Sequence, residues 1–171
     1  TEKKSLADAV VNPHQQDCGY PYKELCGAGV AWNVIRVLYE NYDMDKREAE
    51  DLLDFVAMAT VCDVMSLTGE NRILVKEGLK RIRHTKNIGL QALMQACNVQ
   101  PENISAYHFG YVLGPCVNAT GRLDTARHAL RLFETGQETE AEEIARDLVD
   151  LNQERKELTL QGVEMAKKLC E

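Results

Sequence analysis

Asp63 is the residue whose type and setting most favour chemistry. It follows an apolar run from Leu52 to Cys62, which only Asp54 and Thr60 interrupt. We expect Asp54 to face water near the start of a helix, whereas Asp63 comes after the apolar residues. We expect the Asp63 carboxylate to be removed from water, which is costly unless the carboxylate is paired, hydrogen-bonded or bound to a metal. The alternative is that Asp63 ends the helix and turns outward, or caps the next segment.

A second candidate is the segment 114–124, in which two glycines, a proline, Asn118 and Arg122 lie between two expected helices. Such a loop can present backbone N–H groups at a helix N-terminus beside an arginine, which suits phosphate binding. It can equally be an ordinary helix–helix connection with Asp124 as the N-cap. The residues alone leave both interpretations open.

The other reactive residues form no recognised motif. The sequence has no glycine-rich phosphate loop, H-E-x-x-H or G-x-S-x-G motif. Its six cysteines include no C-x-x-C pair and lie mostly among apolar residues, which favours reduced thiols in a cytoplasmic protein over a disulfide framework or zinc site. They are Cys18, Cys26, Cys62, Cys97, Cys116 and Cys170.

The length and charge of the chain limit the number of domains and the kinds of partner. A chain of 171 residues with 44% apolar residues can form one domain, or one domain with an appendage. The net charge of -7 is concentrated in residues 134–171, where 11 acids face 5 bases, so the rest is nearly neutral. A basic group at 72–86 is interpreted as a solvated helix face, and Arg122, Arg127 and Arg131 form a second group. No apolar stretch is long enough to span a bilayer.

Helical periodicity dominates the chain, and the only strand that we predict is 9–11. One helix should begin after Asp45 and continue through the Asp63 segment, and Gly114-Pro115 should stop another. The predicted helices cover 25–42, 45–63, 71–83, 87–97, 107–113, 124–134 and 138–170. The last has a narrow apolar stripe and would be about 50 Å long, so we expect it to connect or dimerise.

Several motifs occur together and in order over about residues 8–135. They are Asn12-Pro13, the segments 23–31, 59–64, 70–72 and 75–79, then Gly114-Pro115 and the segment 118–123. In this combination the chain resembles the RecJ family of single-strand-specific exonucleases, within the DHH phosphoesterase superfamily. The long final helix is similar to the one that joins the DHH domain of this family to a second domain, DHHA1.

The resemblance implies a phosphodiesterase that uses two Mn²⁺ or Mg²⁺ ions and degrades single-stranded DNA from the 5′ end, in DNA repair and recombination. Asp63 matches a metal ligand of the catalytic site. Asn118 and Arg122 match a loop that faces the active-site groove, and Arg122 should contact a backbone phosphate.

Departures from the family pattern limit this expectation. The chain has no Asp-His-His triplet, no Asp-x-Asp motif upstream of Asn12 and no glycine-rich DHHA1 motif. Asp63 is therefore the only family metal ligand present, and we expect the chain alone to be inactive and to bind no metal tightly. Thr1 should lie just after the position of the triplet.

The resulting expectation is a mainly helical fold. Residues 1–135 would form the C-terminal, mostly helical half of a DHH α/β domain, with at most one or two short strands. Residues 136–171 would form the helix that leads to DHHA1. An apolar surface left uncovered by the other half could mediate a homodimer.

Two alternatives stay open at this stage. One is a phosphodiesterase of the same superfamily that acts on short oligonucleotides or cyclic dinucleotides. The other is a helical interaction module without catalytic activity. The substrate preference of a longer protein carrying this segment would separate the two enzymes, and a parent open reading frame without an upstream Asp-His-His would favour the module.

Overall fold

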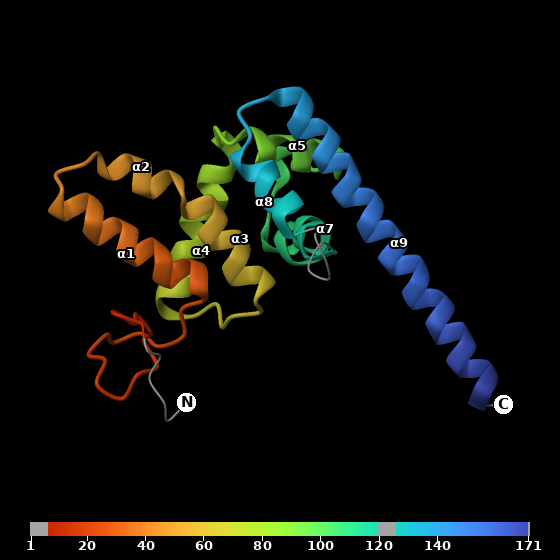
Figure 1. The fold of residues 1–171 in the computed structure, drawn as a ribbon, viewed down its shortest axis with the longest axis horizontal. Helices are drawn as coiled ribbons and strands as arrows, with labels where there is room; N and C mark the ends of the chain where they lie inside the picture. The colour runs from red at the N-terminus through yellow and green to blue at the C-terminus, as the bar shows by residue number, and fades with distance from the viewer. Residues whose placement is uncertain (1–6, 120–125, 171) are drawn as a thin grey trace. The chain divides into compact units, whose positions relative to one another are not determined.

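The protein is described by a computed structural model, which covers residues 7–119 and 126–170. The chain divides into two compact units, Thr1–Arg81 (unit 1) and Ile82–Glu171 (unit 2). Both consist of helices joined by short connections (Figure 1), and no strand occurs within the described ranges. The predicted mainly helical fold is confirmed. No helix in these ranges is both long and apolar enough to cross a bilayer.

Unit 1 contains α1 (Gly27–Asn41), α2 (Lys46–Asp51), α3 (Leu53–Cys62) and α4 (Gly69–Arg81). The helix predicted to run from Asp45 through Asp63 is two helices, because the chain turns at Leu52. The start of α2 is as predicted, since the Asp45 side chain accepts a hydrogen bond from the N–H of Arg47 at 3.0 Å.

The core of unit 1 lies where α3 packs against α4 and the segment before α1. Its buried members are Leu25, Leu53, Val56 and Leu74. Gly78 makes the contact between α3 and α4 possible, since a side chain there would overlap the backbone of Leu53. Close helix packing therefore fixes α3, the helix that ends at the predicted catalytic carboxylate.

The strand predicted at 9–11 is absent, and this is a correction. Residues 9–12 have no regular structure, and the exposed fractions of Val10 and Val11 are 41% and 64%. The turn that follows is held locally: the N–H of His14 donates to the Asn12 side chain at 2.9 Å, and Gln15 Nε2 donates to the Val10 carbonyl at 3.0 Å. A strand needs a neighbouring strand to satisfy its backbone groups, and the described residues provide none.

Unit 2 begins with a 3₁₀ turn, Ile82–His84, and contains a second one at Pro101–Asn103. Its longer elements are α5 (Ile88–Ala96), α6 (Ala106–His108), a π-helical turn (Phe109–Leu113), α7 (Gly114–Ala119), α8 (Ala126–Glu134) and α9 (Glu138–Cys170). The largest fully buried apolar side chains form its core: Ile82, Leu90, Leu93, Phe109, Leu113, Leu132 and Leu148.

Gly114-Pro115 does not stop the preceding helix, contrary to the prediction. The chain passes through the π-helical turn directly into α7, and the Gly114 N–H bonds to the Phe109 carbonyl. A proline inside an α-helix lacks an N–H and clashes with the carbonyl four residues earlier. The wider π-helical turn before Pro115 accommodates the ring, so the backbone remains helical as far as Ala119.

The predicted long helix is confirmed as α9. Its first half packs into unit 2 through Ala141, Ile144, Ala145, Leu148 and Asn152. The predicted apolar stripe of this helix comprises Ile144, Leu148, Leu151, Leu158, Met165 and Leu169. From Gln153 onward every described residue is exposed, including the last three of these. Figure 1 shows this half extending away from the other helices of its own unit.

Candidate functional site

Asp63 is the C-cap of α3, and its N–H donates to the Ala59 carbonyl at 2.9 Å. The side chain is exposed to solvent. The expectation that this carboxylate is removed from water is wrong, and the alternative, that Asp63 ends the helix and turns outward, is correct.

The buried carboxylate of α3 is Asp54, which was expected to face water. Its exposed fraction is 3%, and its Oδ1 accepts a hydrogen bond from the N–H of Phe55 at 2.7 Å. Because the chain turns at Leu52, α3 starts only one residue before Asp54. The carboxylate therefore lies in the first helical turn, where unpaired N–H groups and the helix dipole favour a negative charge.

The turn after Asp63 contains an unusual backbone conformation. Val64 has a φ of 56°, in the left-handed region that β-branched residues avoid. The N–H of Val64 donates to the Val61 carbonyl, and the N–H of Met65 donates to the Thr60 carbonyl, both at 3.1 Å. This is the Schellman ending of a helix, in which glycine is usual at the Val64 position. Asp63 is thus attached to a strained but well-bonded turn.

Asn71 anchors the connection that follows. It is fully buried, and its Nδ2 donates to the carbonyls of Ser66 at 3.0 Å and Glu24 at 2.6 Å. Among the described residues its Oδ1 has no hydrogen-bond donor. Asn71 therefore ties the loop after Asp63 to the segment before α1.

A second link joins the end of α3 to the start of α1. The buried Thr60 hydroxyl donates to the Val56 carbonyl at 2.7 Å and lies 3.3 Å from Cys26 Sγ. Cys26 Sγ in turn accepts from the N–H of Gly29 at 3.4 Å and so caps α1. These bonds hold the helix end that carries Asp63 against α1.

Cys62, the neighbour of Asp63, is a protonated thiol at neutral pH. Burial, and then the negative charge of Asp63, raise its pKa to about 11. A metal ligand or nucleophile would require the thiolate. The reactive group at this helix end is therefore the carboxylate alone.

A divalent cation does not fit the described residues of this chain by themselves. Mg²⁺ prefers an octahedral shell of oxygen ligands, several of them water or carboxylate oxygens. Within residues 7–119 and 126–170, no three His, Cys, Asp or Glu side chains are grouped so that they could hold a metal ion. Asp63 could contribute one ligand, and the others would have to come from elsewhere.

The second predicted site is only partly described. Asn118 lies in α7 with its side chain exposed, so it belongs to a helix and not to the loop that we predicted. Arg122 and Asp124 lie outside the described residues. The proximity of Asn118 and Arg122 to Asp63 stays a prediction, since these residues belong to different units.

Two basic residues of α4, Lys80 and Arg81, have acidic neighbours. Lys80 Nζ lies 2.7 Å from Glu77, and Arg81 pairs with Glu50 and Asp51. This supports the interpretation of 72–86 as a solvated helix face. In unit 2, Arg131 is also paired: its Nε and Nη2 donate to Glu140 at 2.7 and 2.9 Å.

An exposed aromatic pair was not predicted as a functional feature. The rings of Tyr107 and Tyr111 stack with centroids 5.2 Å apart and an angle of 27° between their planes. Their exposed fractions are 63% and 72%, although tyrosine rings are usually at least partly covered. Their spacing of four residues in a predicted helix was the signal that could have identified them.

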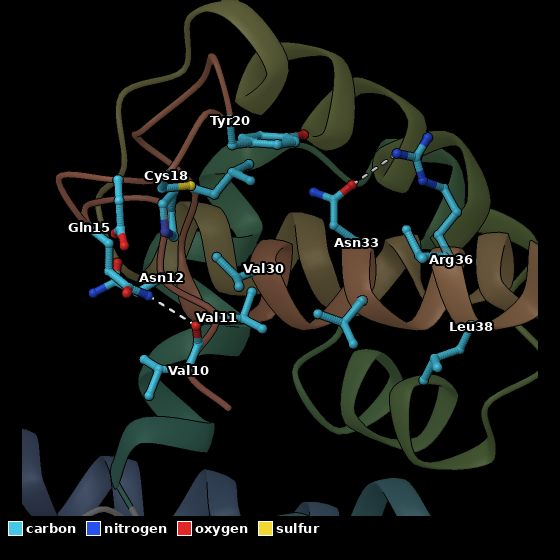
Figure 2. A pocket seen from close by; sticks show the side chains of 15 residues that line it. Val10, Val11, Asn12, Gln15, Cys18, Tyr20, Val30, Asn33, Arg36 and Leu38 are labelled. Carbon is cyan, nitrogen blue, oxygen red and sulfur yellow. Dashed lines mark hydrogen bonds between the residues drawn. The ribbon is translucent and has the colours of Figure 1, made fainter. Parts of the chain in front are cut away.

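Unit 1 also has an apolar groove of about 580 Å³, between residues 10–20 and α1. Figure 2 shows the side chains of Val10, Val11, Val30 and Leu38 lining it, with Arg36 bonded to Asn33 at its edge. Among the described residues that line it, Asp17 is the one acid. The groove therefore suits packing against another apolar surface better than binding of a metal or phosphate.

Comparison with known proteins identifies what this arrangement resembles. No family model matches the sequence. The single-stranded-DNA-specific exonuclease RecJ of Haemophilus influenzae is 38% identical over 174 residues, which cover 96% of this chain. RecJ of Bacillus subtilis is 33% identical over 95% of the chain.

The fold agrees with these sequences. The crystal structure of Thermus thermophilus RecJ in complex with Mg²⁺ matches 90% of this chain with a TM-score of 0.76 and 33% identity. The resemblance to the RecJ family is confirmed. A crystal structure of RecJ bound to manganese also matches, with a TM-score of 0.75 and 34% identity over 87% of the chain.

The matches cover only part of each RecJ protein. This chain spans 30% of the H. influenzae protein, 20% of the B. subtilis protein and 24% of the T. thermophilus structure. The solved RecJ structures contain Mg²⁺ or Mn²⁺. Activity, substrate and metal are therefore properties of longer relatives.

Proposed function

We propose that this chain is part of a RecJ-type, metal-dependent exonuclease that degrades single-stranded DNA in the 5′-to-3′ direction during DNA repair and recombination. The observation that carries this proposal is the match to RecJ proteins over 96% of the chain in sequence and over 90% of the chain in fold. The assignment to the DHH superfamily rests on the same resemblance, and the proposed cytoplasmic location rests on the cysteine pattern of the sequence.

Asp63 supplies one ligand to the Mn²⁺ or Mg²⁺ ions of the complete enzyme. A carboxylate oxygen is the donor that these cations prefer, and the side chain is exposed at a bonded helix end, where it is accessible to ligands from other parts of a longer protein. The chain by itself lacks a grouped set of ligands in its described residues. We infer that the isolated chain does not hydrolyse DNA.

The test uses the protein encoded by the complete open reading frame. Asp63→Asn should abolish Mn²⁺-dependent degradation of single-stranded DNA and weaken Mn²⁺ binding measured by calorimetry. Asp43→Asn is the control, because Asp43 is also an exposed acid just after a helix, with a φ of 52°. Full activity and unchanged Mn²⁺ affinity in Asp63→Asn would refute the ligand role. Nuclease activity of the purified 171-residue chain would refute its inferred inactivity.

Two features of unit 2 are proposed to bind the DNA. Asn118 and Arg122 contact the phosphate backbone, where an arginine releases bound counterions. Tyr107 and Tyr111 offer an exposed stacked surface to a nucleobase, and stacking on an aromatic side chain contributes about 1–3 kcal/mol per base. Stacking suits single strands because every base has a flat face.

The salt dependence of binding separates the two roles. In the complete protein, Arg122→Ala should weaken binding and make the logarithm of affinity depend less steeply on the logarithm of salt concentration. Tyr107→Ala should weaken binding by about 5- to 100-fold with the same salt slope. Arg146→Ala and Tyr42→Ala are exposed controls. An unchanged slope in Arg122→Ala would refute the phosphate contact, and unchanged affinity in Tyr107→Ala would refute stacking.

The domain arrangement is also a proposal. Residues 1–135 form the C-terminal part of a DHH domain, and residues 136–171 form a helix that connects it to DHHA1. The exposed second half of α9 supports this role, since a connector needs no partner along its length.

Homodimerisation through the apolar groove of unit 1 is the competing use of this chain. Val34 lines the groove and is 37% exposed, so Val34→Glu should convert such a dimer to monomers in sedimentation experiments.

A further inference from the structure

Two cysteines of unit 2 lie next to each other although they are 19 residues apart in the sequence. Cys97 is the C-cap of α5, Cys116 lies in α7, and their sulfur atoms are 3.8 Å apart. Cys116 is buried and Cys97 is half-buried. Nothing in the proposed nuclease function uses this pair.

The surroundings of Cys116 provide for both protonation states of its sulfur. As a thiol, it donates to the Val112 carbonyl, 3.3 Å away. As a thiolate, it can accept from Cys97 and from Asn152 Nδ2, which lies 3.5 Å away on α9. A buried sulfur with two donors and one acceptor is unusual for a cysteine that merely fills space.

The electrostatic setting favours the thiolate at Cys116. The hydrogen bond from Cys97 lowers the pKa of the Cys116 thiol, against the effect of burial and with help from Asn152 and the positive charges of Lys156 and Arg155. The same hydrogen bond, together with burial, raises the pKa of Cys97. The pair therefore places a sulfur whose thiolate is favoured beside a protonated thiol that can act as its resolving partner.

We propose that Cys97 and Cys116 are a peroxide-sensitive pair that forms a reversible disulfide. The Cys116 thiolate attacks one oxygen of hydrogen peroxide, which gives a sulfenic acid at Cys116 and releases hydroxide. The Cys97 sulfur then attacks the Cys116 sulfur, the S–O bond breaks, and the departing oxygen leaves as water with the Cys97 proton. Each sulfur is oxidised by one electron equivalent and the peroxide is reduced. A dithiol reductant reverses the reaction by thiol–disulfide exchange.

Formation of the disulfide joins the end of α5 to α7. It closes a loop that contains α6 and the π-helical turn, and the constraint on the unfolded chain should raise the melting temperature of unit 2 by about 5 °C or more. Half-buried Cys97 keeps part of its surface in contact with solvent, which gives a small oxidant access to the pair.

Mass spectrometry of the whole chain tests the proposal. Cys97 and Cys116 lie on one tryptic peptide, residues 87–122, because no lysine or arginine occurs between Lys86 and Arg122. After treatment of the chain with hydrogen peroxide, the mass of this peptide should fall by two hydrogen atoms. Reduction with dithiothreitol should restore the original mass. Cleavage after Glu102 should leave the halves linked until reduction. The exposed Cys170 is replaced by serine throughout to prevent linkage between molecules.

Three variants distinguish the roles of the two sulfurs. Cys97→Ser should stop the reaction at a sulfenic acid on Cys116, which dimedone traps. Cys116→Ser should leave Cys97 unmodified at the same dose. Cys18→Ser, a half-buried thiol in unit 1, is the control and should behave like the unchanged chain. Circular dichroism checks that each variant is folded. The proposal is overturned if the peptide keeps its mass at peroxide doses that oxidise Cys18, or if either cysteine pairs with a different one.

Discussion

Replacement of Gly78 by alanine is the most direct test of how α3 is held. Gly78 lies within α4 and is buried against α3. A Cβ there would overlap the carbonyl oxygen of Leu53 and the Cβ of Ala57, and it would lie 3.1 Å from the carbonyl carbon of Leu53. Because two of these atoms belong to the backbone, no side-chain rotation can relieve the overlap. The two helices must move apart.

The expected cost follows from two opposing effects. Overpacking of a core costs about 1–3 kcal/mol, and backbone overlap places this site at the upper end. Alanine gains about 1 kcal/mol over glycine in helix propensity. The net loss should be about 2 kcal/mol, which lowers the melting temperature by about 4–8 °C in a chain of this size.

Trp32 makes the measurement specific to unit 1. It is the only tryptophan in the chain, and its indole N–H donates to the Ala49 carbonyl at 2.7 Å. Urea unfolding followed by its fluorescence should show a lower midpoint for Gly78→Ala. Gly162→Ala is the control, because Gly162 lies in the exposed half of α9 with nothing within 4 Å of an added Cβ. An equal or higher midpoint for Gly78→Ala would contradict the close packing of α3 on α4.

Three further changes have definite outcomes. Val64→Gly should raise the stability of unit 1 by about 1 kcal/mol, because glycine adopts a positive φ without strain. Little packing is lost, since Val64 is 88% exposed. An unchanged urea midpoint would contradict backbone strain at Val64. Asn71→Ala should lower the free energy of unfolding by about 2–3 kcal/mol, because the carbonyls of Ser66 and Glu24 lose their donor. The urea midpoint followed by Trp32 fluorescence measures this loss, and a midpoint unchanged within error would refute the anchoring role of Asn71. Gly89→Ala should destabilise unit 2, since the added Cβ would overlap the Leu132 carbonyl oxygen. Urea unfolding followed by far-ultraviolet circular dichroism should show a lower midpoint, while the midpoint followed by Trp32 fluorescence stays unchanged.

Helix starts were predictable because their signals are local. Asp45 and Asn87 each lie just before a helix and accept a hydrogen bond from one of its first N–H groups. Ser105 precedes α6, and its N–H donates to His108 Nδ1 at 3.1 Å. Since each cap involves residues two or three apart, no tertiary information was needed to find them.

The burial of Asp54 and the exposure of Asp63 were not predictable, because both depend on packing between helices. The residues of α3 are apolar on nearly every side, so the sequence contains no polar face from which to orient the helix. The turn at Leu52 has no glycine or proline to mark it. Orientation is decided instead by Gly78, which brings α4 onto one side of α3.

The end of the Tyr107–Leu113 helix was mispredicted for a different reason. Glycine followed by proline normally ends a helix, and the rule assumes α-helical geometry before the proline. A π-helical turn changes that geometry, and it has no sequence signal of its own. The resemblance to RecJ was recognisable even so, because it depends on the identity and order of motifs and not on where helices end.

The exposure of Asp63 removes the argument from burial for a metal, and the ligand role stays a proposal that rests on the resemblance to RecJ. A carboxylate that shares a metal with ligands from outside this chain must remain hydrated until they are present, because burial without the metal costs several kcal/mol. The Asp63 carboxylate must still be held in one position, and the backbone of the turn after it holds it there. Val64 accepts a left-handed conformation that costs about 1–2 kcal/mol for a residue with a Cβ, and two backbone hydrogen bonds hold the turn in place. Strain of this kind persists where the surrounding structure fixes a functional geometry, so Val64→Gly should stabilise the fold while it loosens the carboxylate beside it.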